Sequence, residues 1–257
     1  MEKSIYDAYV GILKEELIPA MGCTEPIAVA YAGALARKAL GALPERVSLC
    51  VSGNIVKNVK SVIVPHTGGR KGLKVAVAVG ICCGDADQEL EVISGVTEQQ
   101  LKELDQYLEQ VEVKITESTA NCPFDIQVTA YHGDDCAYAR IIGHHTNVVS
   151  VKKNDNVLVD VPFQDDVVQA PENRKLLDVA HIVQFADEVE IPDVQEVLQR
   201  QIDYNMAIAQ AGMDGSYGAT IGKILLKSYG NCIQNRAKAW AAAGSDARMC
   251  GCELPVV

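Results

Sequence analysis

A cysteine near the N-terminus stands where a helix is expected to begin. The segment GCTEP at positions 22–26 precedes an alanine-rich run over residues 27–40. Thr24 suits the N-cap of this helix, and Pro26 suits its first turn, where a missing N–H costs nothing. The positive end of the helix dipole would lower the pKa of the Cys23 thiol and favour the thiolate. We therefore expect Cys23 to bind a metal or to move protons; a buried structural cysteine is the alternative.

Two further cysteine pairs could carry thiolate chemistry. Cys250 and Cys252 form a C-x-C pair a few residues before Val257. This spacing suits ligation of zinc or an iron–sulfur cluster, although one pair supplies only two ligands. Two thiols in a loop are the alternative. Cys82 and Cys83 lie in an apolar helical run, where neighbouring side chains diverge by about 100°, and core packing is the favoured interpretation.

The segment PHTGGRKG at positions 65–72 opens a second alanine-rich helix. Backbone amides at a helix N-terminus bind anions, and Arg70 and Lys71 add positive charge. We expect His66, Thr67 and Gly68 to hold a carboxylate or a phosphate, and a solvated turn is the alternative. The spacing is not that of a Walker loop.

Two polar segments follow predicted strands and offer further binding groups. In SGNIVK at positions 52–57, the turn residue Asn54 is a weak candidate for substrate binding. In GHHTN at positions 143–147, adjacent histidines on a strand would point to opposite faces, so a two-histidine metal site is not expected. His145 is the candidate for proton transfer or hydrogen bonding, with an ordinary loop histidine equally compatible.

Composition narrows the class of protein. The chain has 257 residues, 48% hydrophobic and 22% charged, which is usual for a globular protein of one or two domains. A net charge of −11 argues against nucleic-acid or anionic-membrane partners. We find no secretory signal and no apolar stretch of about 18 residues that would span a membrane. Nine cysteines without a signal indicate reduced thiols and a cytoplasmic location.

Periodicity predicts helices at both ends of the chain and strands in its middle. Helical spacing covers residues 5–18, 24–40, 71–83, 97–110, 176–188, 194–212, 215–229 and 231–243. Short β-like runs cover residues 47–51, 111–115, 125–131, 137–142, 148–151 and 157–161. The pattern predicts an α+β fold in which residues 1–44 and 168–257 form a helical domain and residues 45–167 an inserted α+β domain.

Five long motifs resemble the L-cysteine desulfidase family, relatives of the iron–sulfur L-serine dehydratase alpha chain. They are GCTEPIAVAYA at 22–32, SGNIVKNVKSVIVPHTGGRKGLKVAVAVG at 52–80, GHHTNVV at 143–149, MDGSYGATIGK at 213–223 and ARMCGCELPVV at 247–257. The resemblance implies degradation of L-cysteine to pyruvate, ammonia and sulfide without pyridoxal phosphate. It also implies a four-iron four-sulfur cluster with three cysteine ligands, whose open iron binds the leaving sulfur.

Carried onto this sequence, the resemblance matches Cys252 to one cluster ligand and Cys23 to a separate cysteine that acts as a base or site thiol. We place Glu25 beside Cys23 as a second catalytic candidate. Family members continue beyond Val257, and their other two cluster cysteines lie in that part. The expectation is therefore a truncated member that lacks the cluster and is inactive alone.

Three alternatives stay open at this point. L-Serine dehydratase activity would differ only in the leaving group. A non-catalytic protein of the same fold would bind a small anion. A structural zinc protein would use Cys250 and Cys252 as ligands. This alternative is the weakest, because the sequence offers no second ligand pair at a spacing that suits zinc. The expected partner is a small amino-acid substrate, with a homodimer possible.

Overall fold

The structure is a computed structural model that describes residues 1–162 and 172–257. Its α-helices are α1 (Lys3–Glu16), α2 (Thr24–Leu40), α3 (Gly53–Val59), α4 (Leu73–Cys83), α5 (Glu98–Gln110), α6 (Val179–Glu188), α7 (Ile191–Asp214), α8 (Ile221–Tyr229) and α9 (Ile233–Met249). Short 3-10 helices are η1 (Ala86–Glu91) and η2 (Glu172–Leu176). The strands are β1 (Ala20–Met21), β2 (Arg46–Val51), β3 (Glu112–Glu117), β4 (Asp125–His132), β5 (Asp135–Ile142), β6 (Val148–Lys153), β7 (Asn156–Asp160) and β8 (Pro255–Val256). This mixture of helices with a mixed sheet confirms the predicted α+β class.

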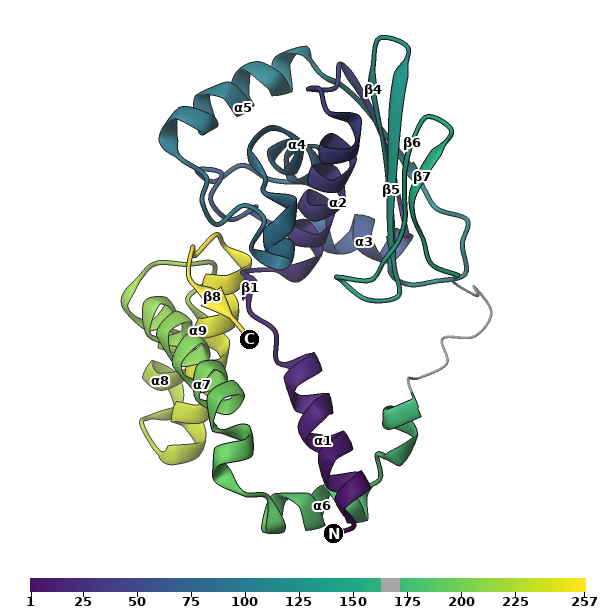
Figure 1. The fold of residues 1–257 in the computed structure, drawn as a ribbon. Helices are drawn as coiled ribbons and strands as arrows, with labels where there is room; N and C mark the ends of the chain where they lie inside the picture. The colour runs from purple at the N-terminus through teal and green to yellow at the C-terminus, as the bar shows by residue number, and fades with distance from the viewer. Residues whose placement is uncertain (163–171) are drawn as a thin grey trace.

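A six-stranded sheet with the order β3-β2-β4-β5-β6-β7 organises the larger lobe (Figure 1). β2 and β3 are parallel, and the other neighbours are antiparallel. Alternation in β2 buries Val47, Leu49 and Val51 in the core that the sheet shares with α2 and α4, and α2 is the helix that contacts the strands. The crossover from β2 to β3 carries α3, α4 and α5, which satisfies the need of parallel strands for a long connection.

The second lobe is a helical arm formed by α6, α7, α8 and α9. α7 packs along α9, and α9 packs against α8. α1 joins this arm through a small apolar cluster in which Tyr9, Phe185 and Val194 are buried. The two-residue strands β1 and β8 pair antiparallel, so the chain returns to the junction between the lobes at its last residues (Figure 1).

The helix α2 lies with the sheet and not with the arm. It packs most extensively on α4 and also contacts β4 and β5, whereas α1 contacts η2 and α7. Its apolar residues surround the helix, since alanines cover several faces, and this pattern fits burial between a sheet and a second helix. The division into domains at residues 44 and 168 stays a prediction. The periodicity placed α2 in the helical domain, whereas the structure packs it on α4 and the sheet.

Two local predictions differ from the structure. Residues 52–54 are not a turn, because α3 begins at Gly53 with Ser52 as its N-cap residue. Ile55 and Val59, four residues apart, are buried and hold this short helix against the core. The N-cap of α2 is Cys23 instead of Thr24, and it makes no side-chain capping bond.

Other boundaries agree closely with the sequence pattern. Thr97 caps α5, and Gln100 completes the predicted capping box. The hairpin expected at residues 132–135 connects β4 and β5. Among the described residues, none of the helices has both the length and the hydropathy needed to cross a membrane.

Candidate functional site

Cys23 and Glu25 meet at the first turn of α2. Cys23 is only 4% exposed, and its Sγ donates a hydrogen bond to Glu25 Oε2 at 3.1 Å. The other oxygen, Oε1, accepts a hydrogen bond from Nδ2 of Asn58 in α3 at 3.2 Å. Asn58 was missed by the sequence reasoning. It stands four residues after Asn54, so recognition of α3 as a helix would have identified it.

The expected thiolate at Cys23 is wrong. Burial, together with the hydrogen bond to Glu25 and the negative charge of that carboxylate, raises the pKa of the Cys23 thiol to about 12. The backbone amide at Glu25 and the positive charge of Arg248 lower this pKa by less. Desolvation and a neighbouring carboxylate therefore outweigh the helix terminus, and Cys23 is a protonated donor at neutral pH.

Glu25 is the ionised member of the pair. Burial by itself would raise the pKa of its carboxyl group. Hydrogen bonds from the Cys23 thiol, from a backbone amide and from Asn58 together outweigh burial, so the pKa of Glu25 lies below its usual value. A protonated His145 would act in the same direction. The site therefore holds a half-buried carboxylate.

His145 lies in the connection between β5 and β6 and stacks on Phe124, with ring centroids 4.5 Å apart. Its Nε2 atom is buried and has no hydrogen-bond partner among the described residues. Burial lowers the pKa of its imidazole, Glu25 opposes that effect, and Arg248 adds to it. His145 is therefore a neutral imidazole with an unused nitrogen at neutral pH.

Arg248, near the end of α9, completes this group from the arm. Its Nε donates to the backbone oxygen of Gly22 at 3.0 Å. The sequence reasoning missed Arg248, because no local pattern reveals that the end of α9 reaches the start of α2. We call Cys23, Glu25, Asn58, His145 and Arg248 the junction cluster, since they come from both lobes.

In the glycine-rich loop before α4, at residues 65–72, the side chains of Thr67 and Arg70 bond to other groups of the protein. The Thr67 hydroxyl is buried and donates to the carbonyl oxygens of Val64 and Arg70. Arg70 in turn forms a two-point ion pair with Asp105 of α5, at 2.8 and 2.6 Å. These side chains are therefore engaged with the protein itself, while Lys71 is exposed. The carboxylate-binding role of the loop stays a prediction.

The other predicted binding residues fall in different surroundings. His66 adopts a left-handed backbone conformation with φ 55°. Its Nε2 is buried without a partner among the described residues, and its Nδ1 lies 3.9 Å from Glu253. Gly68 has φ 64° and is exposed, and Asn54 is also exposed. His145 is thus the predicted binding residue that the structure brings to Cys23 and Glu25.

Cys252 is 3% exposed and packs with Ile208, Ala247 and Val256. A hydrogen bond with Cys252 raises the pKa of the Tyr217 phenol. No group of three or more His, Cys, Asp or Glu side chains in the described residues is arranged to hold a metal ion. The residues present therefore do not fit an iron–sulfur cluster by themselves, and we derive no step through one.

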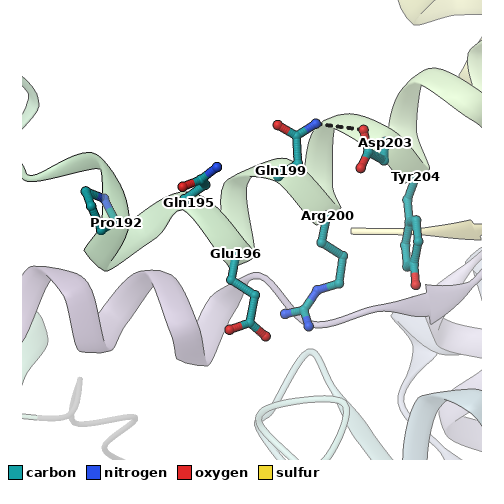
Figure 2. Close-up of a pocket in the computed structure, with 7 residues that line it drawn as sticks. All are labelled: Pro192, Gln195, Glu196, Gln199, Arg200, Asp203 and Tyr204. Carbon is teal, nitrogen blue, oxygen red and sulfur yellow. Dashed lines mark hydrogen bonds between the residues drawn. The ribbon is translucent and has the colours of Figure 1, made fainter.

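Two cavities lie away from the junction cluster. One of about 550 Å³ runs along α7 and is lined by Pro192 and six polar side chains (Figure 2). There Gln199 donates to Asp203 at 2.8 Å, and Arg200 donates to the backbone oxygen of Leu17 at 3.2 Å. The other, of about 330 Å³, lies between α2, α4 and η1 and includes Arg37 and Cys82. Neither cavity contains a residue that the sequence placed in the site.

The mixed sheet, the helical arm and the junction cluster define an α+β protein with a half-buried polar site between two lobes. A family model described as the serine dehydratase alpha chain matches residues 87–257, so the chain belongs to the serine dehydratase alpha chain family. This result confirms the broader part of the resemblance.

The chain is also similar to several UPF0597 proteins. It is 50% identical over 252 residues to one from Desulfitobacterium hafniense, covering 98% of this chain and 59% of the relative. A relative from Treponema denticola is 41% identical over 263 residues, covering 100% of this chain and 61% of the relative. The chain therefore spans about 60% of the length of the curated relatives it matches. No solved structure matches the chain.

Proposed function

We propose that this chain supplies the amino-acid-binding and proton-transfer part of a lyase that works without pyridoxal phosphate. The substrate we place first is L-cysteine, which such a lyase converts to pyruvate, ammonia and sulfide. Membership of the serine dehydratase alpha chain family supports the reaction class. Loss of water from serine and loss of sulfide from cysteine are the same β-elimination with different leaving groups.

The observation that carries the proposal is that two opposite charges, of Glu25 and of Arg248, act on His145. The carboxylate of Glu25 raises the pKa of the His145 imidazole, and the guanidinium of Arg248 lowers it. A free amino acid carries one ammonium and one carboxylate group. Glu25 suits the ammonium group, and Arg248 suits the carboxylate through its remaining N–H groups.

The protonation states suit removal of the α-proton. Neutral His145 has an unused Nε2 that can accept this proton, which is the task of a general base. The Cys23 thiol holds Glu25 by its hydrogen bond and keeps that carboxylate in place. As the C–H electrons form the C=C bond, the C–S bond breaks and sulfide leaves with its electron pair. The resulting aminoacrylate tautomerises to an imine, which water hydrolyses to pyruvate and ammonia.

L-Serine is the second candidate substrate. The description of the matching family favours it, because that description names serine dehydratase. The junction cluster would bind either amino acid in the same way, since both carry the same ammonium and carboxylate groups.

A binding experiment tests the site on the chain as it is. Titration calorimetry with L-cysteine and L-serine should give binding that weakens at least tenfold in Glu25→Gln and in Arg248→Lys. 3-Mercaptopropionate, which lacks the ammonium group, and cysteamine, which lacks the carboxylate, should bind more weakly than L-cysteine. Arg70→Lys is the matched control, because Arg70 is paired with Asp105 outside the cluster. Equal binding by wild type, Glu25→Gln and Arg248→Lys would overturn the site.

An activity experiment tests the reaction. Sulfide and pyruvate are measured under argon after treatment with iron and sulfide, for the chain alone and for the chain co-expressed with the part of the Desulfitobacterium relative that it does not match. We expect turnover only from the pair, and expect His145→Gln to abolish it. Fast turnover by the chain alone would contradict a shared site. Faster turnover of serine than cysteine would move the assignment to serine.

A further inference from the structure

The helical arm exposes much more apolar surface than the sheet lobe. Most of the large apolar side chains that are exposed in the described residues lie within 172–257. Ile233 is 86% exposed and Tyr229 is 71% exposed. A concentration of exposed apolar side chains of this size is unusual in a monomeric protein and indicates an interaction site.

The arm has little core of its own. Its two clusters of buried apolar residues are small: Ile208, Ala247, Cys252 and Val256 form one, and Tyr9, Phe185 and Val194 form the other. The sheet lobe, in contrast, is built around one large continuous core. The arm helices therefore bury one side against each other and leave another side that no described part of the chain covers.

The exposed residues follow helical spacing. Ile202 and Met206 lie four residues apart on α7, and Ile221 and Ile224 lie three apart on α8. Tyr229 ends α8 and Ile233 begins α9. We call these six residues the arm surface. Figure 1 shows α8 beside α7 and α9, on the side of the arm away from α1.

On α8 and α9, which carry four of the six residues of the arm surface, the charge differs from that of the chain. The chain as a whole carries a net charge of −11. Residues 215–249, in contrast, contain one acidic residue, Asp246, and five basic residues: Lys223, Lys227, Arg236, Lys238 and Arg248. Lys227, Arg236 and Lys238 are exposed. An apolar centre with a basic rim is complementary to a protein face that has an apolar centre and an acidic rim.

We infer that the arm surface binds the part of the longer family members that this chain does not match. The matched region covers 59% of the Desulfitobacterium relative, so a polypeptide of substantial length has no counterpart here. All four arm helices lie within the region that the family model matches. The same helices thus occur in proteins that carry additional chain, which is long enough to bury the roughly 1,200–2,000 Å² of a specific interface. This inference is independent of the proposed lyase activity.

Co-expression tests the inference. The part of the Desulfitobacterium relative outside the match carries an affinity tag and is expressed together with this chain. We expect the chain to co-purify as a 1:1 complex whose mass is measured by light scattering. Ile224→Glu, at a position that is 50% exposed, should weaken the complex at least tenfold. Leu158→Glu on β7, at 52% exposed, is the matched control and should leave the complex unchanged.

The competing occupants give different results. A second copy of this chain on the arm surface would appear as a homodimer that Ile224→Glu dissociates and that the relative's segment does not displace. Binding to vesicles with anionic lipids that is lost in Lys227→Glu would assign the basic rim to a membrane surface. Either result would overturn the inference. So would the absence of a complex between the relative's segment and the wild-type chain, or an unchanged complex with an Ile224→Glu variant that circular dichroism shows to be folded.

Discussion

Cys23 shows how burial changes the chemistry of a residue whose sequence context suggests a reactive thiolate. Its place at the start of α2 is the one that the sequence predicts, but its thiol is 4% exposed and hydrogen-bonded to Glu25. A protonated thiol beside an ionised carboxylate is a donor that positions its neighbour. The ionised group of the junction cluster is therefore Glu25, and the base that we propose is the neutral imidazole of His145.

Cysteine alkylation tests this assignment. With a pKa of about 12, Cys23 should react with iodoacetamide more slowly at pH 8 than Cys82, whose pKa is lowered by a hydrogen bond from Cys83. Mass spectrometry of peptides after timed labelling measures both rates, with exposed Cys232 as the reference. Glu25→Gln should accelerate the labelling of Cys23. Faster labelling of Cys23 than of Cys82 would contradict this assignment and support a thiolate at Cys23.

The Glu25 carboxyl group predicts a dependence of stability on pH. Its folded-state pKa is lower than the ordinary value of 4.5, so its contribution to stability is present above that value. As the pH falls through the folded-state pKa, the contribution is lost. The free energy of unfolding, measured with urea, should decrease more steeply below pH 4.5 in the wild type than in Glu25→Gln. Parallel pH profiles would contradict the lowered pKa.

At the scale of the elements, the packing of α2 on α4 depends on a glycine at a point where the two helices lie in close contact. α2 and α4 approach each other so closely that a Cβ atom added at Gly80 would lie 1.9 Å from the backbone oxygen of Ala30. Gly80→Ala should therefore reduce the free energy of unfolding by about 1–3 kcal/mol, because the helices must separate. Gly95→Ala is the control, since nothing lies within 4 Å of its Cβ position. Urea unfolding of both variants checks the difference.

A buried ion pair fixes the register of the central strands. Asp125 of β4 has no exposed side-chain surface and accepts a hydrogen bond from Nε of Arg140 in β5 at 2.9 Å. Ser118 and Gln127 also donate to this carboxylate. Asp125→Ala removes the buried carboxylate to which Arg140, Ser118 and Gln127 donate, and should cost about 3–5 kcal/mol of unfolding free energy. Asp105→Ala, which breaks an exposed pair with Arg70, should cost far less in the same urea titration.

At the scale of the whole molecule, the two lobes differ in the amount of core that they contain. Hydrogen exchange followed by mass spectrometry should show early exchange in α6 and α8 and late exchange in α2 and α4. The reason is that the arm is held by two small apolar clusters, while the sheet lobe has one large cluster. Equal protection of the two lobes would show that contacts at the junction make the molecule one cooperative unit.

The sequence by itself determined the elements and the candidates that depend on local rules. Hydrophobic alternation, helical spacing and the capping box at Thr97 and Gln100 act over a few residues, so β2, β4 and α5 could be predicted from neighbours along the chain. The N-terminus of α2 was found for the same reason, together with the presence of Cys23, Glu25 and His145 as polar groups outside regular apolar patterns.

Only the tertiary structure decided which of these groups meet and in which protonation state. Arg248 lies 226 residues after Gly22, whose backbone oxygen it contacts, and Asn58 reaches Glu25 across 33 residues. Such long-range contacts set the burial of Cys23 and the balance of charges at His145, and these quantities fix the pKa of each group. The packing of α2 on the sheet was likewise decided by contacts with β4 and β5, because an alanine-rich helix fits equally well against strands or helices.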